Sequence, residues 1–399
     1  MKRANLIGII FLCCTCMLGG CTQKDTTVSN IEASKKEKDV TIYIKDSINL
    51  AAYEPLKGVY LGADVSADQN IGRDIRRFDN LIGATNAFKI FQYNPEERIA
   101  NKEILKCIAQ KKTPYIKVYF KSEGDLTPIY RLSMDLKSAY HIPVFIELFP
   151  VSSTMGSPEA YKETYERAYN VIKEYIENAV VVWSISDSKA YESMFYYPGN
   201  RYVDWVGINI YIPRYKSGEA YVYDGKEAID FFYKNFQYSK PMLISGLAIS
   251  HFSRVDHTYT IYDAKQKLDY FYDDLLKNYP RIKGILYVDM DMAEVRENGK
   301  EDYTLTDQPD LTDEMKQLTG ALNVIGTLQQ EADIKNESYM RYDLTGTFFK
   351  NQLYIPSRYM KTIFKKVPLS KLTPIEDING EKFYAFKDIT NYYNCYYKK

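Results

Sequence analysis

The chain has 399 residues, enough for one domain of about 250–300 residues and a small second one. Lys plus Arg and Asp plus Glu both number 52, so the formal net charge is zero. The composition therefore has no excess of positive charge that would indicate nucleic-acid binding. The 38 Tyr against 2 Trp suit sugar binding, because Tyr offers a stacking face and a hydroxyl, although a tyrosine-rich surface would show the same composition.

The N-terminus has the order of features that is typical of a secretion signal. Lys2 and Arg3 precede an uncharged run over residues 4–20, which ends in LGGC at Cys21. This pattern resembles a bacterial lipoprotein signal; an ordinary signal peptide or a membrane helix is the alternative, but the run is shorter than the roughly 20 residues that span a bilayer. We expect a signal peptide over residues 1–20, a lipid on Cys21, and a location at the extracytoplasmic face of the cell membrane.

The next segment is polar. Residues 22–39 read TQKDTTVSNIEASKKEKD, with too little apolar surface to pack, so we expect a flexible tether over residues 21–50. Cleavage before Cys21 would leave Cys107 and Cys395 as the remaining thiols, which excludes a disulfide framework. The three His have no zinc-site spacing with Cys, and we expect neither a metal nor a cofactor.

Eight apolar or β-branched runs then alternate with helical patterns, of which residues 159–176 and 263–279 are the clearest. Near-continuous apolar strands are typical of a parallel sheet covered on both faces. Eight of them, each followed by a helix, predict an α/β fold, a (β/α)8 TIM barrel. The runs cover residues 58–63, 87–92, 115–120, 143–149, 180–184, 204–210, 241–245 and 282–289.

The remainder has a different character. From about residue 326 the chain is rich in Tyr, Phe and Lys, and short extended segments are broken by NQ, NG and Pro turn signals. This predicts a small C-terminal α+β module over residues 326–399. Its strings KNQLYIPSRYM and NGEKFYAFKDI resemble the copper amine oxidase N-terminal-like repeat, an accessory module of bacterial surface proteins.

Six strings follow one another around the predicted barrel: EPLKGVYLGA, PVFIELF, VVWSIS, YYPGNRYVDWVGINIY, SKPMLIS and NYPRIKGILYVDMD. In this order, over roughly residues 54–312, they resemble glycoside hydrolase family 26. The resemblance implies β-mannanase or related β-glycanase ancestry for a barrel domain over residues 54–325. Its active site would lie in the loops at the carboxyl ends of the strands.

The two catalytic positions of that family are vacant in this chain. One Glu normally follows the fourth strand as acid/base and another ends the seventh as nucleophile, whereas the matching residues here are Val151 and Gly246, and Ser153 stands where the family has Asn. Retaining glycosidases need two carboxyl groups about 5–5.5 Å apart. The sequence therefore predicts a glycosidase-like scaffold without its chemistry.

Other residues are candidates for holding a ligand. The resemblance points to Trp183, Asn209 and Tyr211 at the ends of the fifth and sixth strands. Acidic residues beyond strand ends could also populate the cleft, although solvated loop acids are the simpler interpretation for them. Trp205 is expected in the core, and Glu147 too deep in its strand to reach a substrate. The acidic candidates are Asp64, Asp187, Glu192, Asp289, Asp291 and Glu294.

The function we predict is that of a membrane-anchored lipoprotein that binds β-mannan or another β-glycan without hydrolysis, or acts as a surface or spore scaffold. An active β-glycanase that uses relocated carboxylates such as Asp187 or Asp289 is one alternative. A purely structural envelope lipoprotein is the other.

Overall fold

The computed structural model describes residues 37–93, 101–119, 124–137, 142–151, 156–329, 335–377 and 379–398. These residues form two compact units. The larger contains residues 41–343 and 395–398, and the smaller contains residues 37–40 and 344–394. Among the described residues, no helix combines the length and the apolar character that a membrane crossing requires. The predicted signal at residues 1–20 and the lipidated Cys21 lie outside the described residues.

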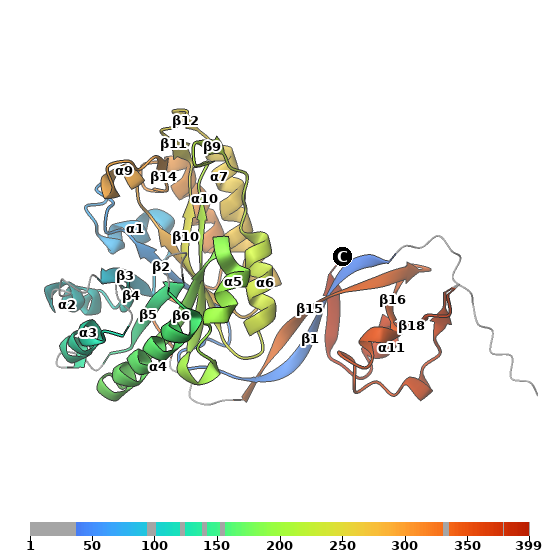
Figure 1. The fold of residues 1–399 in the computed structure, drawn as a ribbon. Helices are drawn as coiled ribbons and strands as arrows, with labels where there is room; N and C mark the ends of the chain where they lie inside the picture. Colours follow the sequence, from blue (N-terminus) through green and yellow to red (C-terminus); the bar gives the residue numbers. More distant parts are fainter. Residues whose placement is uncertain are drawn as a thin grey trace, which may run out of the picture. The chain divides into compact units, whose positions relative to one another are not determined.

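The larger unit is a closed barrel of eight parallel strands (Figure 1). This confirms the predicted (β/α)8 barrel, and every predicted run overlaps a barrel strand. The strands follow one another around the barrel in the order β10, β13, β2, β3, β4, β5, β6 and β7. Their bounds are β2 Tyr60–Asp64, β3 Phe88–Tyr93, β4 Thr113–Val118, β5 Val144–Val151, β6 Ala179–Ser186, β7 Trp205–Ile212, β10 Met242–Ile249 and β13 Ile282–Val288.

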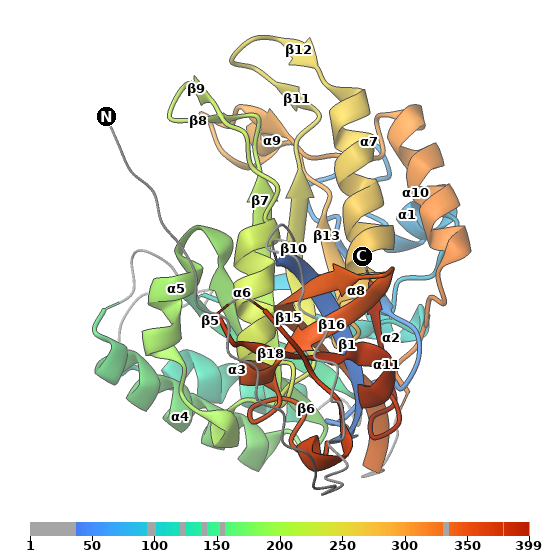
Figure 2. The ribbon, with the colours of Figure 1, turned by 90° about the vertical axis from the view of Figure 1, so that its right-hand side faces the viewer.

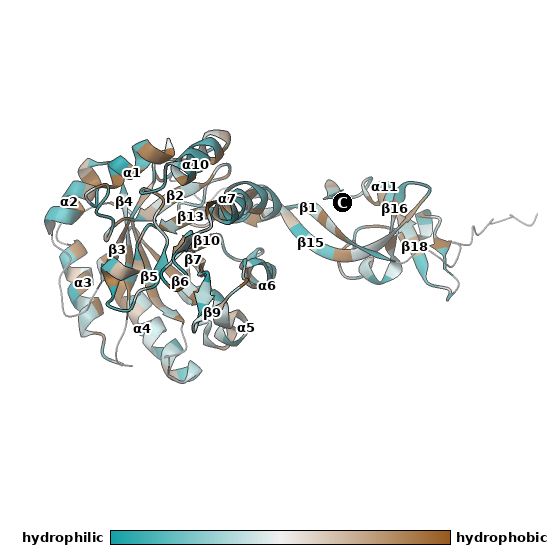
Figure 3. Cartoon of the chain, turned by 90° about the horizontal axis from the view of Figure 1, so that it is seen from above, coloured by the Kyte–Doolittle hydropathy of each residue, from teal (hydrophilic) through white to brown (hydrophobic). Residues whose placement is uncertain are grey.

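Helices surround these strands, as Figure 3 shows along the barrel. The longest is α4. Ser157 caps its N-terminus by accepting a hydrogen bond from the Ala160 N–H, and Pro158 is its first residue. The helices are α1 Ile75–Ile82, α2 Asn101–Ala109, α3 Thr127–Lys137, α4 Pro158–Tyr175, α5 Ala190–Ser193, α6 Lys226–Phe236, α7 Ile261–Asp269, α8 Leu275–Asn278, α9 Met292–Val295 and α10 Pro309–Ala321.

Short strands extend the loops beyond the carboxyl ends of the barrel strands, at the top of Figures 1 and 2. One hairpin follows β7, and a three-stranded sheet of order β12, β11, β14 joins the segments that follow β10 and β13. These strands are β8 Tyr215–Lys216, β9 Glu219–Ala220, β11 Phe252–Ser253, β12 Thr258–Tyr259 and β14 Glu301–Asp302.

The lower barrel interior is an aromatic core. Phe145 packs edge-on against Phe88, with ring centroids 4.8 Å apart, and against Trp205 at 5.4 Å. Trp205 is fully buried and its indole N–H donates to the Ala52 carbonyl at 2.9 Å. The expected packing role of Trp205 is confirmed. A second, larger apolar layer lies between the strands and the helices.

The expected tether over residues 21–50 is wrong for its last part. The strand β1, Lys38–Asn49, pairs with β19, Cys395–Lys398, so that Ile42 lies opposite Tyr397. The cause is the run VTIYI at residues 40–44, whose β-branched side chains favour a strand and bury Ile42 and Tyr43 completely. Cys395, at the start of β19, is a free thiol, as is the buried Cys107.

The smaller unit contains an antiparallel sheet in which β15 pairs with β16, β16 with β18, and β18 with β17. After the barrel, the smaller unit begins at residue 344, later than the predicted residue 326. Residues 395–398, predicted to belong to the C-terminal module, are part of the larger unit. Its elements, with β15 beginning in the larger unit, are β15 Lys335–Phe349, β16 Gln352–Pro356, β17 Ile375–Glu376, β18 Lys382–Ala385 and α11 Phe386–Ile389.

Candidate functional site

A buried cluster of polar side chains fills the barrel interior around Glu147 of β5. The carboxylate accepts hydrogen bonds from the Tyr115 hydroxyl at 2.8 Å, the Ser184 hydroxyl at 2.5 Å and the Asn209 amide at 3.1 Å. Lys117 Nζ lies 3.5 Å from the carboxylate and donates to Asn209 Oδ1 at 2.8 Å. Because none of these residues is more than 8% exposed, the cluster belongs to the core rather than to an open binding surface.

Gly246, at the vacated nucleophile position, faces this cluster. The pairing of β10 with β7 is irregular between Ile244 and Gly246, and Gly246 lies opposite Asn209. A Cβ atom on Gly246 would lie 2.5 Å from Asn209 Oδ1 and 3.2 Å from Lys117 Nζ. The hydrogen-bonded Lys117 and Asn209 side chains therefore occupy the space that a glutamate at this position would need.

Val151, at the vacated acid/base position, does not face the barrel interior. Leu148 pairs with Trp183, whereas Val151 pairs with Ile185, so the register slips by one residue where Phe149 has a φ of 44°. A one-residue slip turns a side chain to the other face of the sheet. Val151 is 2% exposed and belongs to the apolar layer between strands and helices. Its expected position in the cleft is wrong.

A pocket of about 470 Å³ opens at the carboxyl ends of the barrel strands. Tyr211 of β7 is 39% exposed, and its ring packs edge-on against Tyr303 with centroids 6.2 Å apart. Tyr119, just after β4, is 48% exposed. The lining consists of these two tyrosines, the polar residues Ser66, Gln69, Arg73, Gln92 and Glu294, and the apolar residues Ala67, Val288, Met290, Met292 and Val295.

Both pocket tyrosines remain protonated at neutral pH. The pKa of Tyr211 is raised well above its usual value, mainly by burial and secondly by the negative charge of Asp64. The pKa of Tyr119 is also raised, mainly by burial and secondly by the negative charge of Glu147. Each ring therefore offers an apolar face together with a neutral hydroxyl that can donate or accept a hydrogen bond.

The carboxylates beside the pocket are already engaged. Asp64, at the end of β2, is 1% exposed and accepts hydrogen bonds from Gln92 Nε2 and the Ser66 hydroxyl, both at 2.7 Å. Glu294, the one carboxylate among the described lining residues, accepts from Gln69 Nε2 at 2.7 Å. These bonds fix the orientation of two pocket amides, Gln69 and Gln92.

Two predicted ligand residues are wrong because they are completely buried. Trp183 faces the outer apolar layer, where its ring lies 5.7 Å from Phe236 of α6 and 4.9 Å from Tyr197. Asp289 accepts a hydrogen bond from the Leu305 N–H at 2.6 Å. Burial raises the pKa of Asp289 well above its usual value, and no ligand can reach the completely buried carboxyl group.

Of the other predicted residues, some have only structural contacts and others line the pocket. Asp187 accepts from the Ser188 N–H at 2.7 Å, and Asp291 caps α9 and forms a bidentate pair with Arg254 at 2.7 and 2.6 Å. Neither of these acids lines the pocket, and Asn209 belongs to the buried cluster. Tyr211 does line the pocket, together with the acidic candidate Glu294. Ser153 lies outside the described residues.

Among the lining residues that sequence reasoning missed are Arg73, Gln92 and Tyr119. Gln92 is the penultimate residue of β3, and Tyr119 directly follows β4. The carboxyl end of a barrel strand is where functional side chains of this fold gather, so this position was the available signal. Arg73 gave no comparable signal, since it lies in the loop before α1.

Comparison with known proteins finds one family whose model matches part of the barrel. The model of glycosyl hydrolase family 26 matches residues 151–285, which confirms the resemblance predicted from the sequence over that segment. The barrel thus has a fold like that of family 26. The match covers β6, β7 and β10, including Tyr211 and Gly246. No curated protein matches the chain.

Three solved structures are similar at 11% identity and a TM-score of 0.48 each. One is a family 26 β-mannanase from Bacteroides ovatus, with 70% of this chain and 93% of that chain covered. A modular endo-β-1,4-mannanase from Cellulomonas fimi is covered over 76% of its length, again with 70% of this chain. The third is the catalytic domain of an endo-β-1,4-mannanase from a Bacillus species, with 67% of this chain and 87% of that chain covered.

Proposed function

We propose that the mouth of the barrel binds a β-linked glycan, with β-mannan as the first candidate, and does not cleave it. The carrying observation is the composition of the pocket. Two tyrosines and several oriented polar groups line it, while Glu294 is the one carboxylate among its described residues. Aromatic faces with a few fixed hydrogen-bonding groups suit a sugar. Glycosidases of this kind use two carboxyl groups that flank the bond.

The state of the two family positions supports binding without hydrolysis. Val151 is packed among apolar side chains, and the space beside Gly246 holds Asn209 and Lys117. The relocated acids of the alternative enzyme hypothesis fit poorly. Asp289 is buried, and Asp187 does not line the pocket. The family match supports a glycan, rather than another class of ligand, for this position in the barrel.

Replacing Tyr211 with Ala is expected to weaken binding of a β-1,4-linked mannohexaose at least about tenfold, or about 1.4 kcal/mol. The change removes a half-exposed aromatic face from the pocket wall. Isothermal titration calorimetry on wild type and variant measures the difference, and circular dichroism confirms that the variant is folded.

Tyr262→Ala is the matched control for Tyr211→Ala. Tyr262 is 75% exposed, lies on α7 and does not line the pocket, so its loss should leave the affinity unchanged. Equal affinity of wild type and Tyr211→Ala would place the ligand elsewhere. No binding of β-mannan, β-glucan or xylan oligosaccharides by the wild type would leave the purely structural lipoprotein as the better account.

We also propose, on the sequence pattern alone, that a lipid on Cys21 holds the chain at the extracytoplasmic face of the membrane. The LGGC ending and the basic residues Lys2 and Arg3 support it. Mass spectrometry of the membrane-extracted chain should show an acylated N-terminal cysteine. A bare thiol at Cys21 would contradict the anchor.

A further inference from the structure

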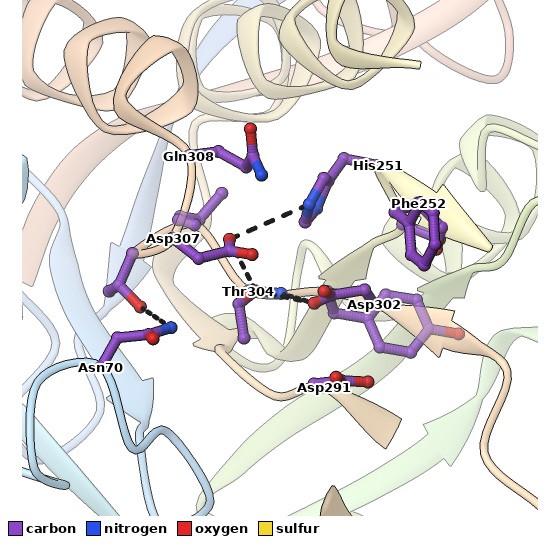
Figure 4. A network of polar contacts seen from close by, with 12 residues as sticks. Asn70, His251, Phe252, Asp291, Asp302, Thr304, Asp307 and Gln308 are labelled. Atoms are coloured by element: carbon purple, nitrogen blue, oxygen red, sulfur yellow. Dashed lines mark hydrogen bonds and ion pairs between the residues drawn. The ribbon is translucent and has the colours of Figure 1, made fainter. Parts of the chain in front are cut away.

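Three potential metal ligands meet beyond the carboxyl ends of β10 and β13. His251 follows β10, Asp302 ends β14, and Asp307 lies just before α10. One ligand atom from each of the three side chains lies within 4.8 Å of the other two. Figure 4 shows His251, Asp302 and Asp307 converging from these separate segments.

The imidazole of His251 points into this cluster without a partner. The residue is completely buried, and neither ring nitrogen has a hydrogen-bond partner among the described residues. Its nearest charged neighbour, Asp307 Oδ1, lies 3.9 Å from Nε2, too far for a hydrogen bond. Buried polar groups are normally satisfied by protein, water or an ion, so this histidine needs an explanation.

The same threonine orients both carboxylates. Asp302 Oδ1 accepts from the Thr304 N–H at 2.9 Å and from its hydroxyl at 2.7 Å. The hydroxyl also lies 2.9 Å from Asp307 Oδ1 (Figure 4). Groups of this kind, bonded to the ligands rather than to an ion, hold metal ligands in position. The cluster therefore has two fixed carboxylates and one free imidazole.

We propose that His251, Asp302 and Asp307 bind one divalent first-row metal ion, of the class of Mn²⁺ or Zn²⁺. One imidazole nitrogen with two carboxylates suits these ions, whereas Ca²⁺ and Mg²⁺ prefer oxygen ligands throughout. Metal–ligand bonds of about 2.0–2.2 Å require the ligand atoms to move slightly inward. The Asp307 side chain, 30% exposed, lets water complete the coordination.

The ion would stabilise one wall of the pocket. Asp302 precedes Tyr303, whose ring packs against Tyr211 and whose N–H donates to the Met290 carbonyl at 3.0 Å. Tyr211 and Met290 both line the pocket. By joining the segment after β10 to β14 and to the start of α10, the metal would hold this wall in place. The binding site itself stands apart from the proposed glycan function.

Mn²⁺ is the first probe, because Cys107 and Cys395 are free thiols and thiolates favour Zn²⁺. After chelator treatment, the full-length chain should bind about one Mn²⁺ and show a higher melting temperature in its presence, since a ligand of the folded state stabilises it. His251→Asn and Asp307→Asn should each weaken binding at least about tenfold, as loss of one of three ligands implies. Calorimetry with Mn²⁺ and Mg²⁺ measures the affinity and the preference.

His257→Asn and Asp310→Asn are the matched controls. His257 is exposed and lies six residues beyond His251, and Asp310, three residues beyond Asp307, has a side chain that is 77% exposed. Both should bind Mn²⁺ like the wild type. The partly exposed Asp307→Asn keeps the test valid should His251→Asn fail to fold. No Mn²⁺ binding by the wild type, or equal binding by wild type and both ligand variants, would overturn the proposal.

Discussion

Replacing Lys117 with Met is expected to lower the free energy of unfolding by about 3–5 kcal/mol, because it leaves the buried carboxylate of Glu147 without its counter-charge. The Lys117 side chain is 2% exposed and that of Glu147 is completely buried. The change also removes the hydrogen bond to Asn209, which lies opposite Gly246. Chemical denaturation at neutral pH measures the loss.

Two further variants separate charge burial from a general loss of packing. Adding Glu147→Gln to Lys117→Met removes the uncompensated charge and should recover at least half of the lost stability. Lys277→Met makes the same substitution in an exposed pair with Asp273 and should cost less than about 1 kcal/mol. A Lys117→Met variant as stable as the Lys277→Met variant would mean that the buried cluster is not an ion pair.

Val151→Glu is expected to destabilise the chain by a similar amount and to create no glycosidase. The new carboxyl would lie in the apolar layer beside Ile185 instead of in the pocket. Adding Gly246→Glu would not help, because Asn209 and Lys117 fill the space beside position 246. Denaturation of the single variant and a reducing-sugar assay of the double variant test the two statements.

The pH dependence of the stability of Val151→Glu shows whether the new buried charge causes the destabilisation. A carboxyl buried without partners has a pKa above its unfolded value, so its penalty is small below about pH 4 and grows as the pH rises toward the folded pKa. Val151→Gln has the same size without the charge and should show no such dependence. Glycanase activity in Val151→Glu, with wild-type stability, would show that position 151 faces the cleft after all.

The sequence was sufficient for the barrel because eight near-continuous apolar runs alternate with helical patterns, as is typical of this fold. It could not show the irregular pairings in β5 and β10. A slip of one residue near Phe149 leaves no mark on composition, yet it moves Val151 from the cleft into the outer layer. Trp183 was misplaced because alternation along β6 turns it toward α6, and both faces of the strand are apolar.

The candidate sites depend on proximity that only folding creates. Tyr211 was predicted because it follows a recognisable string, while Tyr119 lies in the loop after another strand. His251, Asp302 and Asp307 have no motif spacing, and their meeting depends on the pairing of β11 with β14. Glu147, set aside as too deep to act, became the centre of the buried cluster.

The most direct test of binding without cleavage is one titration followed by analysis of its own ligand. Mannohexaose is titrated into the wild-type chain in a calorimeter, and the contents are then incubated and examined by mass spectrometry. The account predicts saturable heat of binding and intact hexasaccharide, because Val151 and Gly246 stand at the two positions where the family has its catalytic carboxylates. Shorter mannosides that appear with wild type, and persist when the protein is purified further, would contradict it.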